Sequence, residues 1–528
     1  MAIASAVCLF AGFAAVCCYR LFRLGRRDHQ CSRGPKKIVY AFFHPHASGG
    51  GGGERVLWKM IQFLQSSSHR RHRCGFGEGE SSAGKRQSNS TNTKENKEEE
   101  LENVDDDDDK IEIIIYTIDP PSTSERDLRL DAERRFDVSI PKEVRLVSLE
   151  EYKDYLSPRP FLSLVMESWG TMKLARRALM ATILNENKQE FDAEDCEFVF
   201  CDTTGCAFTF AVVRWMCPPT IRVLAYVHYP TISTDMMMWE WQKTNTNASI
   251  KQKIKTVVKL GYYYLFSVAY GLCGSLADLV MVNSTWTYNH IYGLWRFRSG
   301  AQRKRQPIQI VYPPCRVPSN VDSETSDCND TYQRENTIIS IGQFRPEKNH
   351  KLQIQSLSIL LESHQELRAK DSDRVKLLLI GSCRNDSDRA RVDELRRLVE
   401  KLGLQDHVVF NINPPYQELQ ASMYRASIGI HTMRQEHFGI GIVEMMAAGL
   451  LTIAHDSGGP KSDIILEVGG TGYLATTAKE YADAMHKALT LDAKEADAMR
   501  QKAKASATRF SDEAFDKNLE RVLPLLYC

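Results

Sequence analysis

Two glutamates eight positions apart carry the clearest chemical signal in this chain of 528 residues. Glu436 follows the apolar run Ala426–Ile430, so we expect it on the loop that leaves a buried strand. Glu444 is surrounded by good helix formers, which predicts a helix beginning near Phe438, Gly439 and Gly441. The free N–H groups at such a helix start suit a sugar joined to a diphosphate. The alternative is an ordinary amphipathic helix with two solvated acids.

A second candidate is the basic loop Gly342–Asn349, which follows the predicted strand Thr337–Ile341. Arg345 and Lys348 in this loop could stabilise a diphosphate leaving group, because negative charge builds on its oxygens as the bond to the sugar breaks. A solvated basic turn is the alternative.

The first half of the chain offers His228, at the end of the predicted strand Val223–Val227, and the glycine run Gly49–Gly53 beside His44. The glycines match neither the dinucleotide-binding pattern nor a Walker motif. They allow close backbone approach to an anionic or sugar group, particularly at Gly50, Gly51 and Gly52. A flexible surface turn remains the alternative for the glycines, and support of a loop remains the alternative for His228.

Predicted strands and helices alternate along most of the chain, which indicates parallel sheets with crossover helices. We expect two α/β domains, 35–316 and 337–528, joined by a polar linker at 317–336. Ligands should bind between the domains, outside the carboxyl ends of the strands. The closing helices after Lys479 are assigned to the second domain.

Composition limits the partners. The segment 66–110 has almost no large apolar groups and is predicted to be a disordered insertion. Residues 94–110 carry ten acids against three lysines while the whole chain has a net charge of +1, so the remaining body is mildly basic and suited to anionic lipids or diphosphates. The sequence has no stripe of basic residues interleaved with aromatics, so nucleic acid is not predicted as a partner. The 14 cysteines follow no metal-ligand pattern, and no Asp-x-Asp motif follows a strand, so neither a metal nor a cofactor is predicted.

Two segments bear on the membrane. Residues 1–27 are an apolar run followed by Arg20, Arg23, Arg26 and Arg27, which predicts a single-pass anchor with the remaining chain in the cytosol. A cleaved signal peptide is the weaker alternative. The segment 251–277 has four lysines near its start, and its remainder, 261–277, is uncharged and contains four tyrosines. A membrane-surface or buried helix is favoured there over a second span, since a span would divide one sheet across the bilayer.

These motifs resemble those of a known family. The Glu436–Glu444 spacing resembles the signature of retaining glycosyltransferases of the GT-B fold (family 4 type), in which two Rossmann-like domains face each other across a cleft. The stretches 38–58, 222–240, 340–352 and 431–459 resemble, more specifically, the α-1,2-mannosyltransferases of asparagine-linked glycosylation.

The resemblance implies GDP-mannose as donor and dolichol-diphosphate-linked Man3GlcNAc2 as acceptor, which would receive its fourth and fifth mannoses at the endoplasmic-reticulum membrane. It also implies a complex with other early-pathway mannosyltransferases. Glu436 would face the donor sugar and Glu444 the ribose. Lys348 matches the family lysine, whereas Gln343 occupies the family arginine position, and Arg345 is the predicted substitute.

Two other functions stay open from the sequence. One is a transferase that uses another nucleotide sugar on the same scaffold. The other is a non-catalytic membrane subunit that recruits partner transferases, although a scaffold has no physical need for Glu436, Glu444 and Lys348 together.

Overall fold

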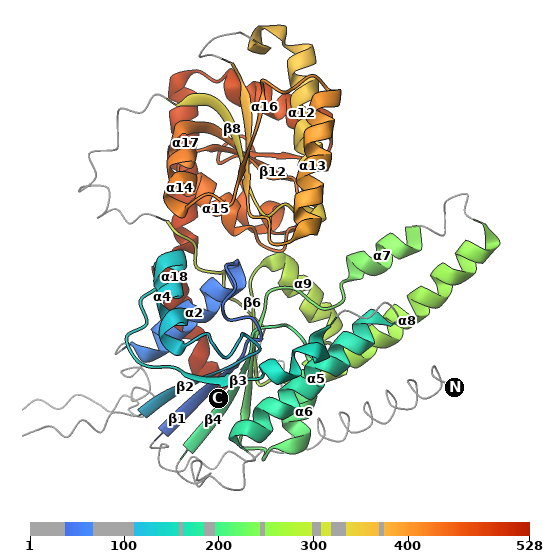
Figure 1. Ribbon diagram of the computed structural model, residues 1–528, viewed down its shortest axis with the longest axis vertical. Coiled ribbons are helices and arrows are strands. Elements are labelled where there is room, and N and C mark those ends of the chain that lie inside the picture. Colours follow the sequence, from blue (N-terminus) through green and yellow to red (C-terminus); the bar gives the residue numbers. More distant parts are fainter. Residues whose placement is uncertain are drawn as a thin grey trace, which may run out of the picture.

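The computed structural model describes residues 37–66, 110–157, 162–183, 196–242, 249–297, 308–317, 334–368 and 374–527. These residues form two α/β domains, one above the other in Figure 1. The predicted anchor at 1–27, nearly all of the insertion at 66–110 and most of the linker at 317–336 lie outside the described residues.

The first domain contains a seven-stranded parallel sheet with the strand order β3-β2-β1-β4-β5-β6-β7. Its strands are β1 (Lys37–Phe43), β2 (Lys110–Thr117), β3 (Arg145–Ser148), β4 (Cys196–Asp202), β5 (Arg222–Val227), β6 (Leu279–Val282) and β7 (Gln309–Ile310). The central strands are apolar runs buried on both faces, as expected for a parallel sheet covered by helices. Phe43 pairs with Asp202, and Asp202 with Ala225, so the loops after β1, β4 and β5 leave the same edge of the sheet.

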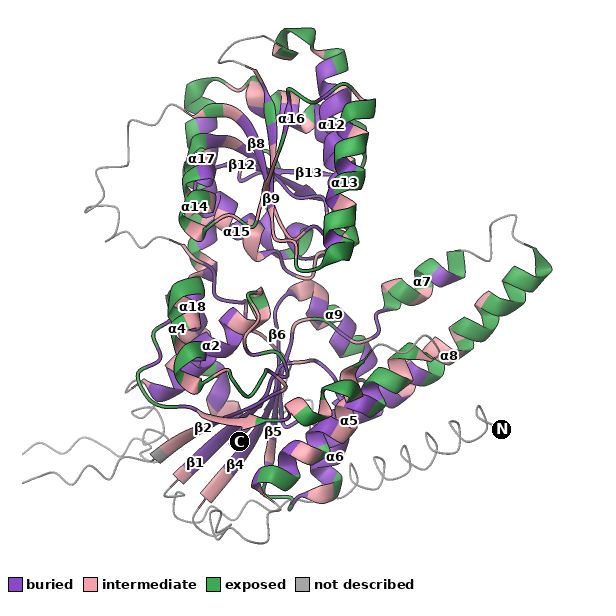
Figure 2. Cartoon of the chain, viewed as in Figure 1, coloured by how far each residue is buried: buried purple, intermediate pink, exposed green. Residues whose placement is uncertain are grey.

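Helices cover both faces of this sheet, with buried strands between exposed outer helix surfaces (Figure 2). They are α2 (Gly52–Gln65), α4 (Glu125–Phe136), α5 (Ser163–Thr182), α6 (Phe208–Met216), α7 (Thr234–Gln242), α8 (Ile250–Gly274) and α9 (Thr285–Leu294), together with the 3-10 helix η1 (Glu150–Leu156).

The second domain contains a six-stranded parallel sheet with the order β10-β9-β8-β11-β12-β13. Its strands are β8 (Glu335–Ile341), β9 (Lys376–Gly381), β10 (Val408–Ile412), β11 (Ala426–Ile430), β12 (Leu451–His455) and β13 (Tyr473–Ala475). Its helices are α12 (His350–Ser363), α13 (Asp386–Lys401), α14 (Tyr416–Arg425), α15 (Ile440–Ala447), α16 (Ala478–Leu489) and α17 (Ala493–Ala507). Short helices η3 (Pro346–Lys348) and η5 (Pro460–Ile464) follow β8 and β12.

The last helix, α18 (Asp512–Val522), packs on the first domain, which corrects its predicted assignment to the second. Phe515, Leu519 and Val522 join the apolar core beneath β1 and α2, and the Arg55 guanidinium donates to Asp512 at 2.8 Å. The apolar face of α18 is complementary to the first-domain core, and the sequence pattern gave no sign of which domain it would cover.

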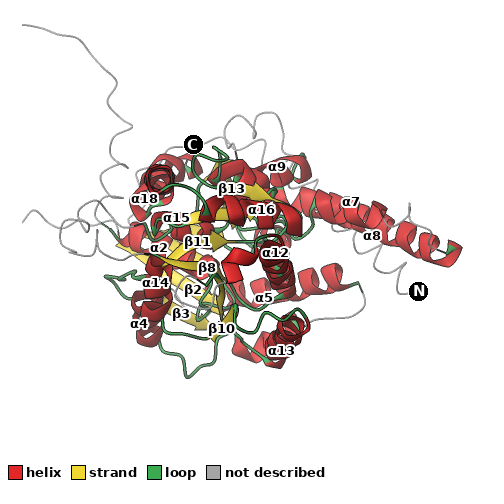
Figure 3. Cartoon of the chain, turned by 90° about the horizontal axis from the view of Figure 1, so that it is seen from above, coloured by secondary structure: helices red, strands yellow, loops and turns green. Residues whose placement is uncertain are grey.

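Helices α7 and α8 extend away from the body of the first domain in both views (Figures 1 and 3). The residues of α8 are largely exposed up to Leu265 and largely buried from Phe266 to its end. Within the described ranges no helix, α8 included, is long and apolar enough to cross a membrane.

Candidate active site

The loops after β8 and β11 bring Lys348 and Glu436 together. Lys348 Nζ donates to Glu436 Oε2 at 2.6 Å, and His431 Nε2 lies 3.1 Å from the same oxygen. Burial alone would raise the pKa of Glu436, but Lys348 and His431 outweigh it and hold that pKa well below its usual range. Glu436 is therefore ionised at neutral pH. Lys348 Nζ also donates to Met433 Sδ at 3.4 Å, so one further N–H remains for a ligand.

Lys348 is held in place through its own backbone. Thr432, one residue beyond His431, donates its hydroxyl to Lys348 O at 2.9 Å, and Gln353 Nε2 donates to the hydroxyl oxygen of Thr432 at 2.9 Å. Asn349 takes a left-handed conformation (φ 50°) where η3 passes into α12. The lysine stem crosses over Gly342, where an added Cβ would lie 3.6 Å from it. The strand-end loop thus fixes where the lysine stem begins.

Arg345 and Gln343 lie in the same loop. The guanidinium of Arg345 is 3.5 Å from Glu347, and its Nε is buried without a hydrogen-bond partner in the described part of the chain. Arg345 also interacts electrostatically with the Tyr229 hydroxyl of the first domain, so the guanidinium is close to the interdomain face. Neither geometry assigns the family arginine role to one of the two, and that assignment stays a prediction.

The helix predicted at Glu444 is α15, and it begins where the sequence indicated. Its N-cap is Gly439, whose φ of 116° is accessible mainly to glycine. The first N–H groups of α15, at Ile440 and Gly441, have no intrahelical partner and can bind an anion. Phe438 is buried beneath them, and Gly449 ends the helix in a left-handed conformation.

Glu444 lies on α15 opposite the first domain's α2. Burial raises the pKa of Glu444, while Arg55 and Arg316 oppose that rise. A partly shielded carboxylate at the domain boundary can accept hydrogen bonds from the hydroxyls of a ribose.

The turn Ser457–Gly459 supports the Glu436 loop. Gly459 N–H donates to Glu436 O at 2.8 Å, and Gln435 N–H donates to Ser457 Oγ at 2.8 Å. Gly458 has φ 65°, and a Cβ there would lie 2.3 Å from Glu436 O.

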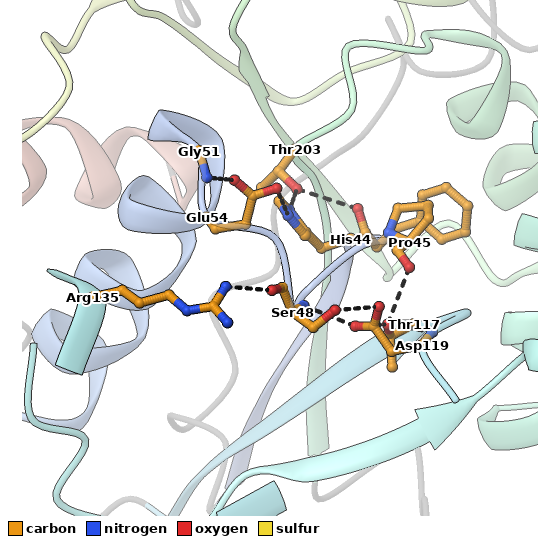
Figure 4. Close-up of polar contacts among 10 residues, drawn as sticks. His44, Pro45, Ser48, Gly51, Glu54, Thr117, Asp119, Arg135 and Thr203 are labelled. Atoms are coloured by element: carbon orange, nitrogen blue, oxygen red, sulfur yellow. Dashed lines mark hydrogen bonds and ion pairs between the residues drawn. The ribbon is translucent and has the colours of Figure 1, made fainter. Parts of the chain in front are cut away.

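On the first domain, the glycine run begins α2 and lies against Glu54 and His44 (Figure 4). Glu54 accepts from Gly51 N–H at 2.8 Å and approaches His44 Nε2 at 3.7 Å. Burial raises the pKa of Glu54, but His44 and two backbone N–H groups together lower it by more. The net shift of this pKa is therefore downward. His44 Nδ1 lies 2.6 Å from the Thr203 hydroxyl, so the ring spans from the carboxylate to the loop after β4.

The turn before the glycines is fixed by a separate network (Figure 4). Ser48 donates its N–H and hydroxyl to Asp119 at 2.8 Å each, while Arg135 donates to Ser48 O at 3.0 Å. These hydrogen bonds fix Ser48, the residue directly before the glycine run.

His228 faces the same turn. A Cβ on Gly53 would lie 3.5 Å from His228 Nε2, and that nitrogen is buried without a partner among the described residues. Burial lowers the pKa of His228 to about 4, so the ring is neutral and can exchange a hydrogen bond with a hydroxyl. Asn283 Nδ2 donates to His228 O at 2.8 Å and holds its backbone.

The two groups of loops meet across the domain boundary. A Cβ on Gly52 would lie 2.5 Å from Ile440 Cδ1 at the start of α15. His437, next to Glu436, stacks on Tyr229 with a centroid separation of 5.1 Å and an interplanar angle of 16°. Loops of both halves that carry predicted residues therefore contact each other at the domain boundary.

Sequence reasoning missed His431, His437 and Glu54. His431 directly follows a buried strand, so the strand-end rule that selected His228 could have found it, and Glu54 adjoins the glycine run that the sequence singles out. Asp202, at the end of β4, has a structural role: it accepts from Thr204 N–H, Gly205 N–H and the Thr209 hydroxyl before α6.

Among the described residues, one group has ligand atoms close enough for a metal, namely His364, Glu366 and His486. The two imidazoles stack in parallel, 8° apart with centroids 3.5 Å apart, so their ring planes do not converge on one ion. None of these three residues belongs to the interdomain loops.

Comparisons with known proteins agree with this architecture. The family description "ALG11 mannosyltransferase N-terminus" matches residues 37–94 and 99–295, and "Glycosyl transferases group 1" matches residues 323–506. The mouse protein named GDP-Man:Man(3)GlcNAc(2)-PP-Dol alpha-1,2-mannosyltransferase is 38% identical over 492 residues, covering 92% of this chain and 86% of its own. A Dictyostelium discoideum protein of the same name is 35% identical, covering 93% and 85%.

Solved structures share the fold at low identity. Anabaena HepE, in complex with UDP and glucose, has a TM-score of 0.54 at 15% identity and covers 92% of this chain and 99% of its own. Sucrose-phosphate synthase from Thermosynechococcus elongatus has a TM-score of 0.55 at 16% identity, with coverage of 93% and 99%.

Two parallel-sheet domains of this kind, with the group 1 transferase match on the second, define a glycosyltransferase of the GT-B fold. Within that class, the chain belongs to the family of GDP-Man:Man(3)GlcNAc(2)-PP-Dol alpha-1,2-mannosyltransferases.

Proposed function

We propose that this protein transfers mannose from GDP-mannose to dolichol-diphosphate-linked Man3GlcNAc2 with retention of configuration. It adds the fourth and fifth mannoses in α-1,2 linkage on the cytosolic face of the endoplasmic reticulum. The observation that carries the proposal is the group of half-buried Lys348 and Glu436 with buried His431, beside the free N–H groups of α15. The names of the relatives support the choice of donor and acceptor.

Each group has a role in this reaction. Lys348, assisted by Arg345 and the start of α15, stabilises the charge that develops on the GDP diphosphate. Glu436 and nearby amides position the mannose, while Glu444 binds the ribose. His228 and the glycine turn beside His44 border the acceptor sugar. The acceptor 2-hydroxyl attacks C1 from the face that the diphosphate leaves, and a diphosphate oxygen takes its proton as the C1–O bond to the phosphate breaks.

The acceptor is a membrane lipid, and the surface of α7 and α8 suits a membrane. Many exposed side chains there are apolar or aromatic, which is unusual for a face in water. They are Met236, Met238, Trp239, Trp241, Ile250, Ile254, Val257, Val258, Tyr264 and Leu265. Exposed lysines at 251, 253 and 255 accompany them and can meet anionic headgroups. This surface would lie in the headgroup region of the membrane.

The test is mannose transfer by the purified chain from GDP-mannose to lipid-linked Man3GlcNAc2 in the presence of EDTA. Wild type should add two mannoses that an α-1,2-mannosidase removes, and Glu436→Ala should add none. Transfer only from a different nucleotide sugar would show that GDP-mannose is not the donor. No transfer by a folded protein that binds no nucleotide sugar would favour the non-catalytic subunit.

A further inference from the structure

The helix α9 of the first domain begins against a carboxylate of the second. Thr285, its first residue, donates its N–H to both oxygens of Asp463, at 3.1 and 3.2 Å, and its hydroxyl to Oδ1 at 2.6 Å. The first N–H groups of a helix lack intrahelical acceptors, and the helix dipole favours an anion there. Ser284, the N-cap of α9 in its own domain, accepts from Thr287 N–H, and Asp463 of the second domain satisfies the Thr285 N–H in addition.

Asp463 is almost completely buried, with 1% of its surface exposed. Besides Thr285, the Tyr312 hydroxyl donates to Oδ1 at 3.0 Å and the Ser462 hydroxyl donates to Oδ2 at 3.0 Å. Burial raises the pKa of Tyr312 to about 12, with Asp463 adding to the rise, so this donor keeps its proton at neutral pH. Among the described residues these donors are the hydrogen-bond partners of the buried carboxylate, and they fix one relative position of the two domains, because a small shift would break its bonds to Thr285.

The element that carries Asp463 also supports the donor loop. η5 follows the turn in which Gly459 N–H donates to Glu436 O and Ser457 accepts from Gln435 N–H. The next residue of that loop, His437, contacts two first-domain rings, Tyr229 and Trp286, each with centroids 5.1 Å away. Trp286 directly follows Thr285, so both contacts converge on the start of α9.

We propose that Asp463 and His437 are positioning residues that dock the Glu436 loop onto the start of α9. The inference rests on the proposed function, in which one domain binds the donor sugar and the other the acceptor. Neither side chain needs to touch a substrate. They set the distance between the reacting atoms, and a misplacement of about 1 Å can cost roughly 100-fold in rate.

The test uses the full chain with Asp463→Asn, Thr285→Val and Thr285→Ser. An asparagine amide would turn an N–H donor toward the Thr285 donors, so Asp463→Asn should lower kcat by about 100-fold while GDP affinity, measured by calorimetry, stays unchanged. Thr285→Val removes the hydroxyl donor and keeps the N–H donor, so kcat should fall by less. Thr285→Ser keeps both donors and should restore the wild-type rate. Asp456→Asn, at an exposed ion pair with Lys461, is the matched control.

Hydrogen–deuterium exchange supplies a readout independent of catalysis. Asp463→Asn should accelerate exchange in peptides that cover Thr285 and His437, with the remainder of both domains unchanged. Unchanged exchange and kcat would overturn the proposal, as would a loss of GDP affinity equal to the loss in kcat. If Asp463→Asn fails to fold, Thr285→Val gives the same test from the other domain. If wild type transfers no mannose, the proposed function fails, while the exchange result still decides the docking.

Discussion

The ammonium group of Lys348 lies 2.6 Å from Glu436 Oε2, although 88 positions of sequence separate the two residues. The pair forms because the parallel strands β8 and β11 are neighbours and end at the same edge of the sheet. Thr432 then ties the two loops by donating to Lys348 O. The carboxylate therefore holds a cation in place before a diphosphate arrives, so less reorganisation is needed during the reaction.

Replacement of Lys348 by alanine should lower kcat by about 100- to 1,000-fold, as expected when one preorganised donor to a leaving group is lost. The measurement is turnover at saturating GDP-mannose, with thermal unfolding recorded because Glu436 loses its ion-pair partner. Lys351→Ala, an exposed lysine on the neighbouring α12, is the control and should retain full turnover. An unchanged kcat in Lys348→Ala would remove this residue from the leaving-group role.

Glu444→Ala should act mainly on donor binding. A hydrogen bond from a ribose hydroxyl to a carboxylate is worth about 1.5–3 kcal/mol, so the affinity for GDP should fall by roughly ten- to a hundredfold. Calorimetry with GDP measures this directly, and kcat at saturating donor should change much less. Glu394→Ala, on the exposed face of α13, controls for the loss of a charge. If GDP affinity is retained in Glu444→Ala, the ribose contact is wrong.

Gly458→Ala should displace the Glu436 loop and abolish most of the turnover. The new Cβ would lie 2.3 Å from Glu436 O, and its backbone has φ 65°, so both strain and collision oppose it. Gly469→Ala separates the two causes, since Gly469 has φ 81° with no atom within 4 Å of a Cβ. That control should lose some stability and keep its turnover. Equal losses of turnover in the two variants would show that strain alone, rather than the collision with the loop, explains the effect.

The sequence was sufficient for strands that are apolar runs. The strands predicted at Val223–Val227, Thr337–Ile341 and Ala426–Ile430 are present within two residues at each end. The short edge strands β3, β7 and β13 were not predicted, because two to four residues carry too little pattern to distinguish them from loops. The polar helices α13 and α14 were also missed, since each buries only a narrow apolar stripe.

The candidate site was predictable where motifs fall at strand ends, as for Glu436, Lys348 and His228. The partners were not. Whether Glu436 pairs with Lys348 depends on strand order, and the placement of Glu54 against His44 depends on a helix that begins at a glycine. The contact of Asp463 with Thr285 depends on how two domains meet, which no local pattern encodes.

The buried, neutral state of His228 predicts a pH-dependent contribution to stability. Its pKa is about 4 in the folded chain and near 6.5 when unfolded, so the unfolded state binds more protons between these values. The contribution is complete above about pH 6.5 and is lost as the pH falls toward 4, by at most about 1.4 kcal/mol per pH unit. Asp202, whose pKa burial raises to about 6, contributes in the opposite direction below pH 6.

A variant isolates the histidine from Asp202. The Tm of wild type minus that of His228→Asn should decrease between pH 7 and pH 5, because only the wild type must keep this ring unprotonated to fold. Differential scanning fluorimetry at three pH values measures the gap. A gap that is constant with pH would mean that His228 titrates normally in the folded chain.

The exposed surface of α7 and α8 should contact the membrane while the second domain does not. In vesicles that contain anionic lipid, a photoactivatable acyl-chain probe should label peptides from Thr234–Gln242 and the exposed part of α8, and should leave α16 and α17 unlabelled.

Trp239→Ser combined with Trp241→Ser removes two large apolar groups, each worth about 1.5–3 kcal/mol when buried. This variant should lose labelling of α7 and turn over the lipid-linked acceptor at least tenfold more slowly, while a short-chain water-soluble acceptor is used at the wild-type rate. Tyr424→Ser, which removes an exposed aromatic from the second domain, should change neither result. Equal slowing on both acceptors would instead assign the two tryptophans to the fold of the first domain.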